Sequence, residues 1–214
     1  MRHLIPALIL LAAPALAEDK PNLDPTAAAV PGAVALYLSA RALYDQGVAV
    51  NDPLMVLTAA RMLRGVTLIA ADRIPDPAAK TAPQVIPLDP AVLLATARAL
   101  NPDGTLTDLI NATAAETPPP PKALRATPAH LDPGQSQAWT LQFYGGTYAE
   151  LAIIGAGQGN LDLLVTDANG NPICQDNGSA DTATCGFVPR DNGDFTVSVT
   201  NSGQSPDAYQ LITN

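Results

Sequence analysis

The sequence has few of the residues on which common catalytic and metal sites depend. It contains two histidines and two cysteines in 214 residues. Residues 18–121 contain neither type, and their only serine is Ser39. A Ser-His-Asp arrangement or a histidine-ligated metal site therefore cannot be built within that stretch. His130 would need a nucleophile beside it to act as a base, and a solvated surface position is the simpler interpretation. The sequence favours a protein that is not an enzyme.

Basic residues are also scarce, with 11 Lys and Arg against 20 Asp and Glu and a net charge of −9. Nucleic acids and anionic membrane surfaces are bound through basic patches, so we expect neither as a partner. The apolar run of residues 4–13 is shorter than the roughly 20 residues that span a bilayer. Arg2 before it and Ala15-Leu16-Ala17 after it are typical of a signal peptide, residues 1–17. We expect export to the periplasm or the cell exterior, with no membrane span after cleavage.

The two cysteines, Cys174 and Cys185, both lie near the C-terminus. In an exported protein, a lone pair at this spacing is most simply a disulfide. A metal site or a catalytic thiol would need histidines nearby, which the sequence does not supply.

Residues 24–116 are rich in Ala and Leu, which favours helices. Asp52-Pro53 and Asp89-Pro90 each begin a similar apolar pattern, with Asp as the cap and Pro at the first helical position. Further helices are expected over about 32–44 and 105–115. We predict a small all-α bundle rather than a helical repeat array.

Four consecutive prolines at 118–121 cannot continue a helix, because each removes a backbone donor. We predict a proline-rich, semi-rigid linker over residues 117–125.

Residues 126–214 change to a period of two. Trp139, Leu141 and Phe143 alternate with polar or small residues, and a second strand over 148–154 follows Gly145-Gly146, which predicts a hairpin. Trp139 is expected in the core. Further alternating segments fall at 161–165, 195–199 and 209–213. Short strands at this spacing predict an antiparallel β-sandwich, so the chain is expected to be an α+β multidomain protein.

The same half resembles the bacterial pre-peptidase C-terminal domain, a small jelly-roll-like β-sandwich. The stretches that carry the resemblance are Leu161-Asp162-Leu163, Asp167-Ala168-Asn169-Gly170-Asn171, Asp176-Asn177-Gly178, Phe187-Val188-Pro189, 193–199 and Tyr209-Gln210-Leu211. The resemblance covers residues 126–214 only. It implies an accessory or binding role rather than proteolysis, because such domains aid substrate binding, export or stability, and some bind calcium.

Oxygen-bearing side chains gather around the turn after residue 165. Calcium takes six to eight oxygen ligands, and the candidates are Asp162, Asp167, Asn169, Asn171, Asp176 and Asp181. The same residue types make tight turns, and position six of an EF-hand-like loop beginning at Asp167 is Pro172 in place of glycine. Turn formation is the simpler interpretation, and calcium is kept as the alternative.

The function expected from the sequence is that of a non-enzymatic binding or accessory protein of the bacterial envelope. The β-sandwich is the expected binding module, and an envelope polymer or a protein is the expected partner. Tyr144 and Tyr148, which flank the Gly-Gly turn, are the candidate binding residues. Two alternatives stay open: a carboxylate-dependent hydrolase acting on a glycan, and a calcium-stabilised secretion or folding aid.

Overall fold

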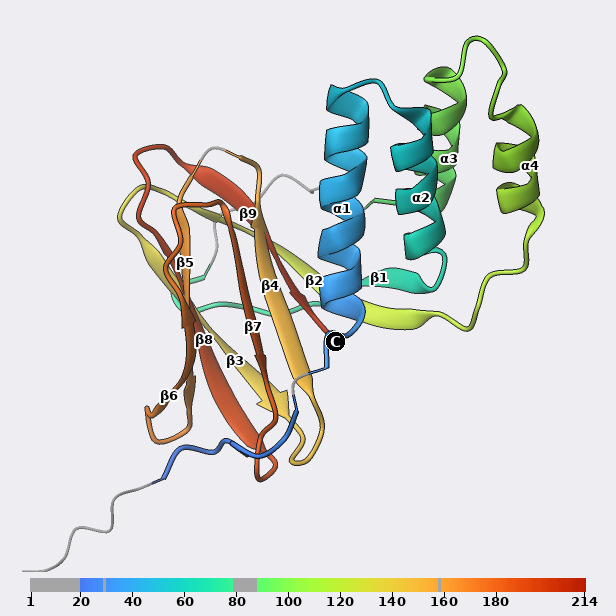
Figure 1. Ribbon diagram of the computed structural model, residues 1–214. Coiled ribbons are helices and arrows are strands. Elements are labelled where there is room, and N and C mark those ends of the chain that lie inside the picture. The colour runs from blue at the N-terminus through green and yellow to red at the C-terminus, as the bar shows by residue number, and fades with distance from the viewer. Residues whose placement is uncertain (1–19, 29, 79–87, 158) are drawn as a thin grey trace, which may run out of the picture.

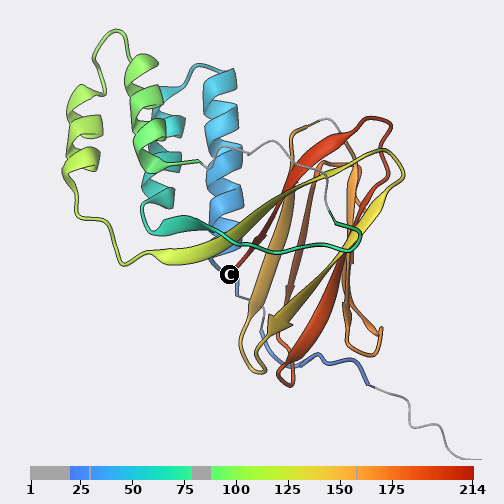
Figure 2. The same cartoon turned by 180° about the vertical axis from the view of Figure 1, so that it is seen from behind.

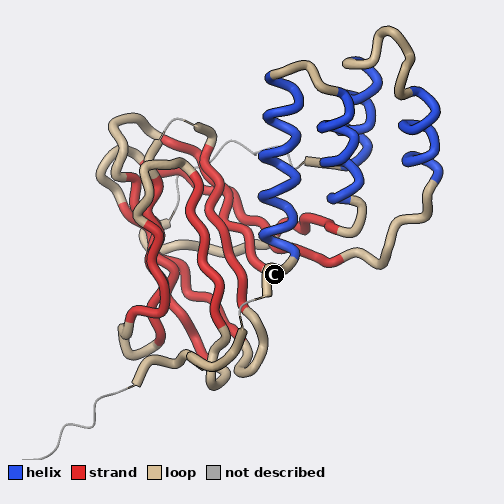
Figure 3. The backbone as a smooth tube through the Cα atoms, viewed as in Figure 1, coloured by secondary structure: helices blue, strands red, loops and turns tan. Residues whose placement is uncertain are grey.

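A computed structural model of the chain describes residues 20–28, 30–78, 88–157 and 159–214. The expected signal peptide, residues 1–17, lies outside this range. A row of helices stands beside a two-layered sandwich of strands (Figures 1 and 3). Within the described ranges, none of the helices has both the length and the apolar character needed to cross a membrane.

The four helices of the described ranges follow one another side by side in chain order (Figure 1). They are α1 (Ala33–Ala49), α2 (Pro53–Leu63), α3 (Pro90–Ala99) and α4 (Thr107–Ala115). The two Asp-Pro starts are confirmed. The Asp52 carboxylate accepts hydrogen bonds from the amides of Leu54 and Met55 at 2.8 and 3.1 Å, and Asp89 accepts one from Ala91. These bonds satisfy amides of the first turn that have no partner within the helix.

The sandwich consists of two sheets. In the larger sheet the strands β1 (Val66–Ala70), β2 (Lys122–Leu131), β9 (Asp207–Thr213), β4 (Ala149–Gly155) and β7 (Thr182–Phe187) lie in that order. The smaller sheet has the order β3 (Ser136–Phe143), β8 (Gly193–Asn201), β5 (Leu161–Asp167) and β6 (Pro172–Asp176). Among these described strands, β1 pairs with β2 in parallel and the other pairs are antiparallel. The α+β fold class is confirmed.

The space between the sheets is filled by alternate side chains of the strands. Trp139 is 1% exposed, as its phase in β3 predicts. Its indole Nε1 donates a hydrogen bond to the Tyr209 hydroxyl at 3.1 Å, and that hydroxyl donates to Gln137 at 2.8 Å. The polar ends of both aromatic residues are thereby satisfied inside the core, as buried indole and phenol groups require.

A second core lies on the other face of the larger sheet, under the helices. Ala152, Ile154 and Ile212 pack there with helical residues such as Val56 and Leu63. Strand β4 is therefore buried on both faces along its whole length. A strand covered on both faces reads as a continuous apolar run rather than an alternating one.

Three expectations need correction. The predicted hairpin at Gly145-Gly146 is wrong, because β3 and β4 belong to different sheets and the turn carries the chain from one sheet to the other. Gly145 is needed there, since a Cβ atom would lie 2.7 Å from the Arg190 carbonyl oxygen. The expected all-helical stretch 24–116 contains β1, and β2 begins at Lys122, inside the range expected to be linker.

After β1 the chain runs across the side of the sandwich, which Figure 2 shows from behind. We call residues 71–78 the crossover segment. The Ala71 amide donates to the Ala126 carbonyl in the larger sheet at 2.9 Å. Asp76 exchanges two main-chain hydrogen bonds of 2.8 Å with Ala138 of β3 in the smaller sheet. The crossover segment therefore links the two sheets along this side.

Candidate functional site

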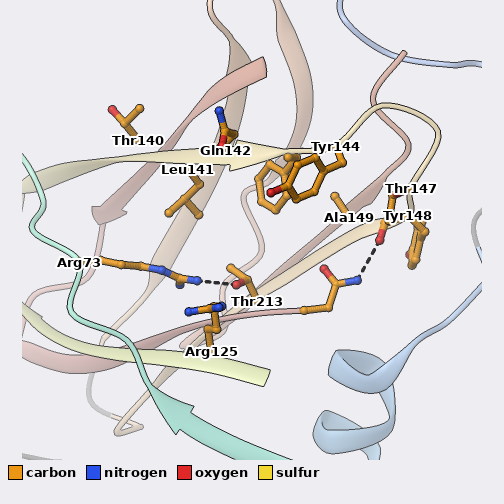
Figure 4. A pocket seen from close by; sticks show the side chains of 12 residues that line it. Arg73, Arg125, Thr140, Leu141, Gln142, Tyr144, Thr147, Tyr148, Ala149 and Thr213 are labelled. Carbon is orange, nitrogen blue, oxygen red and sulfur yellow. Dashed lines mark hydrogen bonds between the residues drawn. The ribbon is translucent and has the colours of Figure 1, made fainter. Parts of the chain in front are cut away.

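A pocket of about 540 Å³ opens where the space between the two sheets reaches the Gly-Gly turn (Figure 4). Strand β3, the turn after it, the ends of β2 and β9, and the crossover segment all contribute to its walls. Its volume lies within the roughly 300–1,000 Å³ typical of small-ligand sites. None of the residues that line it is acidic.

The pocket exists because the inner face of the larger sheet changes from apolar to polar towards one end. Along β2, Leu131, Ala129 and Thr127 are buried, and Arg125 continues the same alternation. Along β9, Tyr209 and Leu211 belong to the core, and Thr213 follows in the same phase. Arg125 and Thr213 are partners in the register of the two strands, so the polar ends meet.

Arg73 reaches this place from the crossover segment. Its Nη2 donates a hydrogen bond to the Thr213 hydroxyl at 2.7 Å, and Figure 4 shows both arginine side chains beside Thr213. Its Nη1 is buried and has no hydrogen-bond partner among the residues that the structure describes. Burial, and then the positive charge of Arg125, lower the pKa of the Arg73 guanidinium. Two like charges therefore face one small space.

The two candidate tyrosines lie on the rim of the same pocket. Tyr144 is 64% exposed, whereas Tyr148 is half-buried and its pKa is raised by burial and by the charge of Glu150. The turn between them is held by main-chain contacts, because the Gly146 amide donates to the Pro189 carbonyl at 2.8 Å. The side chain of Asn214 donates to the Tyr148 carbonyl at 2.8 Å, which fastens the turn to the end of β9.

The sequence thus pointed to the two tyrosines but not to the arginines. Arg73 and Arg125 lie in different halves of the chain, and they meet through the parallel pairing of β1 with β2. One signal was present: Arg125 occupies an inward phase of its strand, continuing Thr127, Ala129 and Leu131. A charged residue in an apolar phase is the kind of exception that marks a site.

The oxygen-bearing residues proposed for calcium are split between the two ends of β5. Asp162 lies near the start of β5, where the Ser202 hydroxyl donates a hydrogen bond to its carboxylate. Asp176 lies close to the same end, because it is the residue after the one in β6 that pairs with Leu164. Asp167 lies at the far end, followed by the turn that contains Asn169 and Asn171. The remaining candidate, Asp181, directly precedes β7, and its main-chain oxygen accepts a hydrogen bond from the Gly155 amide.

The Asp167 carboxylate serves the turn. It accepts hydrogen bonds from the Asn169 and Asn171 amides at 3.0 and 2.9 Å, from the Asn171 side chain, and from the Asn22 amide. Burial alone would raise the pKa of this carboxyl, but these hydrogen bonds outweigh it and hold the pKa below its ordinary value. The described part of the chain contains no group of three or more His, Cys, Asp or Glu side chains placed to hold a metal ion. Calcium binding stays a prediction.

The expected disulfide is present between Cys174 and Cys185, whose Cα atoms are 6.1 Å apart. It joins β6 to β7, each of which is an edge strand of its sheet on this side of the sandwich. The sandwich is therefore closed by the disulfide on this side and by the crossover segment on the other. His130 lies outside the pocket, with Nε2 3.4 Å from the Asp132 carboxylate.

Comparisons with known proteins find no matching family model and no matching curated protein. Among solved structures, the chain is similar to the pre-peptidase C-terminal domain of a collagenase from Bacillus anthracis, with 13% identity over 42% of this chain and 87% of that one and a TM-score of 0.35. It is also similar to PliG, a periplasmic inhibitor of g-type lysozyme from Aeromonas hydrophila, with 12% identity over 42% of this chain and 86% of that one and a TM-score of 0.31.

A carbohydrate-binding module of Cellvibrio mixtus lichenase 5A in complex with cellotriose shows 12% identity over 39% of this chain and 72% of that one, with a TM-score of 0.27. Similarities at this level carry no information about a ligand. They lie in the C-terminal part of the chain, and the helical half has no match. The collagenase domain is of the family that residues 126–214 resemble in sequence, the pre-peptidase C-terminal domain.

Proposed function

We propose that the protein is an exported, non-enzymatic binding protein whose β-sandwich holds an envelope polymer in the pocket beside Tyr144. The observation that carries this proposal is the pocket itself. It combines an exposed aromatic ring with converging polar side chains, which is the usual composition of a ligand site.

The walls of the pocket are organised before any ligand arrives. The Gly-Gly turn is held by the Pro189 carbonyl and by the Asn192 side chain, which accepts from the Gly145 amide at 2.8 Å. Thr213 is fixed between two strands and hydrogen-bonded to Arg73. A preorganised site loses little conformational entropy on binding, so a modest contact area is enough for useful affinity.

Export is supported by the N-terminal pattern of residues 1–17 and by the disulfide, which persists in oxidising compartments. N-terminal sequencing of the secreted protein should begin at Glu18. A chain that keeps residues 1–17 after export would contradict this part of the proposal.

The hydrolase alternative would be recognised by two carboxyl groups facing each other about 5–10 Å apart in a cleft. The pocket described here has no acidic residue in its lining, so no specific observation favours that alternative at this place.

The proposal is tested by co-sedimentation of the full-length protein with insoluble polysaccharide prepared from cell envelopes. Tyr144→Ala should weaken binding about fivefold or more, as expected for the loss of an aromatic anchor. Leu54→Ala is the control, because that side chain is exposed on α2 and lies outside the pocket. Equal binding by Tyr144→Ala and the wild type, or no binding by the wild type, would overturn the proposal.

A further inference from the structure

The two arginines of the pocket have no acidic partner in the part of the chain that the structure describes. Three other arginines of the described residues lie near acids: Arg41 pairs with Asp45, and Arg61 and Arg64 pair with Glu116. Arg73 and Arg125 form no salt bridge among the described residues, although the whole chain contains 20 acidic residues. The lining of the pocket is therefore positive in a protein whose net charge is −9.

The Arg73 guanidinium also has unused hydrogen-bonding capacity. Nη2 is bound to Thr213 at 2.7 Å, while Nη1 is buried without a partner in the described part of the chain. Buried donors are nearly always satisfied in native proteins, so an unsatisfied one requires an explanation. An anion placed between the two guanidinium groups would accept from Nη1 and would neutralise the repulsion between the two charges.

We propose that the pocket recognises an acidic saccharide, whose carboxylate lies between Arg73 and Arg125 and whose ring packs on Tyr144. This inference rests on the proposed function and specifies its ligand class. The planar guanidinium fork matches a carboxylate with two parallel hydrogen bonds, which a point charge does not.

The surroundings favour a carboxylate over a phosphate. Phosphate sites in proteins commonly use the free amides of a helix N-terminus. The nearest such end is that of α1, and its amides are already occupied, because Gly32, Val34 and Ala35 donate to the Glu150 carboxylate. In place of free helix amides, the pocket presents the exposed aromatic ring of Tyr144, which suits the apolar face of a sugar.

The test is calorimetric titration of the full-length protein with digalacturonate and, separately, with its methyl ester. The ester keeps the rings and removes only the charge. We expect the acid to bind and the ester to bind about tenfold or more weakly, since hydrogen bonds to a charged group are worth about that factor. Inorganic phosphate is the third probe and should compete poorly with the acid.

Variants separate recognition from folding. Arg125→Gln removes an exposed guanidinium, and Arg73→Gln removes the half-buried one. Each should weaken binding of the acid about tenfold or more without changing binding of the ester. Arg98→Gln is the matched control, because it makes the same charge change on the exposed side of α3, and should leave both affinities unchanged. Arg73→Lys keeps the charge and should restore only part of the affinity.

Melting temperatures complete the test. A purely structural role for Arg73 would lower the melting temperature and weaken the acid and the ester alike, which would overturn the inference. Equal affinity for the acid and the ester would also overturn it, while leaving the proposed function in place. Binding of phosphate that depends on both arginines, without binding of digalacturonate, would assign the pocket to a different anion and contradict the inference. Failure of both sugars to bind would contradict it as well, and the envelope co-sedimentation then judges the proposed function separately.

Discussion

Replacement of Glu150 by Gln should loosen the attachment of the helices to the sandwich. Glu150 lies on β4 and is only 5% exposed. Its carboxylate accepts from the amides of Val34 and Ala35 at 2.9 and 3.0 Å, and from Gly32 at 3.2 Å. One side chain of the sheet therefore caps the first turn of α1, which has no side-chain cap of its own.

The expected cost follows from the number and kind of these hydrogen bonds. A hydrogen bond to a charged group contributes about 1.5–3 kcal/mol net, and a charge at a helix N-terminus about 0.3–1 kcal/mol. Gln keeps one acceptor oxygen but turns an amide NH₂ towards amide donors. We therefore expect a loss of about 2–4 kcal/mol in the free energy of unfolding, rather than the full sum.

Urea unfolding followed by circular dichroism measures this loss. For a chain of this size, each kcal/mol lowers the melting temperature by about 2–4 °C. Asp45→Asn, which breaks the exposed pair with Arg41 on the same helix, is the control and should change stability by less than about 1 kcal/mol. A loss below about 0.5 kcal/mol in Glu150→Gln would refute the view that this carboxylate holds α1 to the sheet.

Three further outcomes are expected. Asp167→Asn should be less stable than the wild type at neutral pH. The difference in stability should vanish as pH falls through the lowered pKa of Asp167 in the folded protein, because the stabilisation requires the ionised carboxylate. A difference in stability that persists in acid would contradict this. Tyr209→Phe should cost about 1–3 kcal/mol in urea unfolding, because it leaves the buried indole NH of Trp139 without an acceptor. Reduction of Cys174–Cys185 should cost about 3 kcal/mol by loop entropy, and unchanged melting after reduction would refute that estimate.

Much of the sandwich could be predicted because its signals are local. Trp139, Leu141 and Phe143 alternate along β3 and are buried as their phase requires. The Asp52 and Asp89 caps follow from the chemistry of a helix start. The disulfide follows from cysteine count and compartment.

The errors arise where contacts between distant parts of the chain decide the structure. Strand β1 is short and largely exposed, and it is a strand because β2, far along the chain, pairs with it. The hairpin was expected because Gly145-Gly146 separates two strands, but β4 is covered on both faces and joins the sheet under the helices. Strand pairing of this kind is not encoded in local propensity.

The same reason limited what could be predicted of the pocket. Tyr144 and Tyr148 were identified from a local feature, the turn that they flank. Arg73 joins them only because β1 places the crossover segment against β3, so its role depends on tertiary structure. The sequence offers only an indirect signal for Arg73, which is that its neighbour in the pocket, Arg125, is a charged residue in the inward phase of its strand.

The most direct measurement of the central claim is a titration of the ¹⁵N-labelled full-length protein with digalacturonate, followed through the chemical shifts of the backbone amides. We expect saturable shifts that cluster at Arg73, Arg125, Tyr144 and Thr213, with little change along α1–α4. Shifts confined to the turn after Asp167 or to the helices, or no shifts at all, would contradict the claim that this pocket is a binding site for an acidic saccharide.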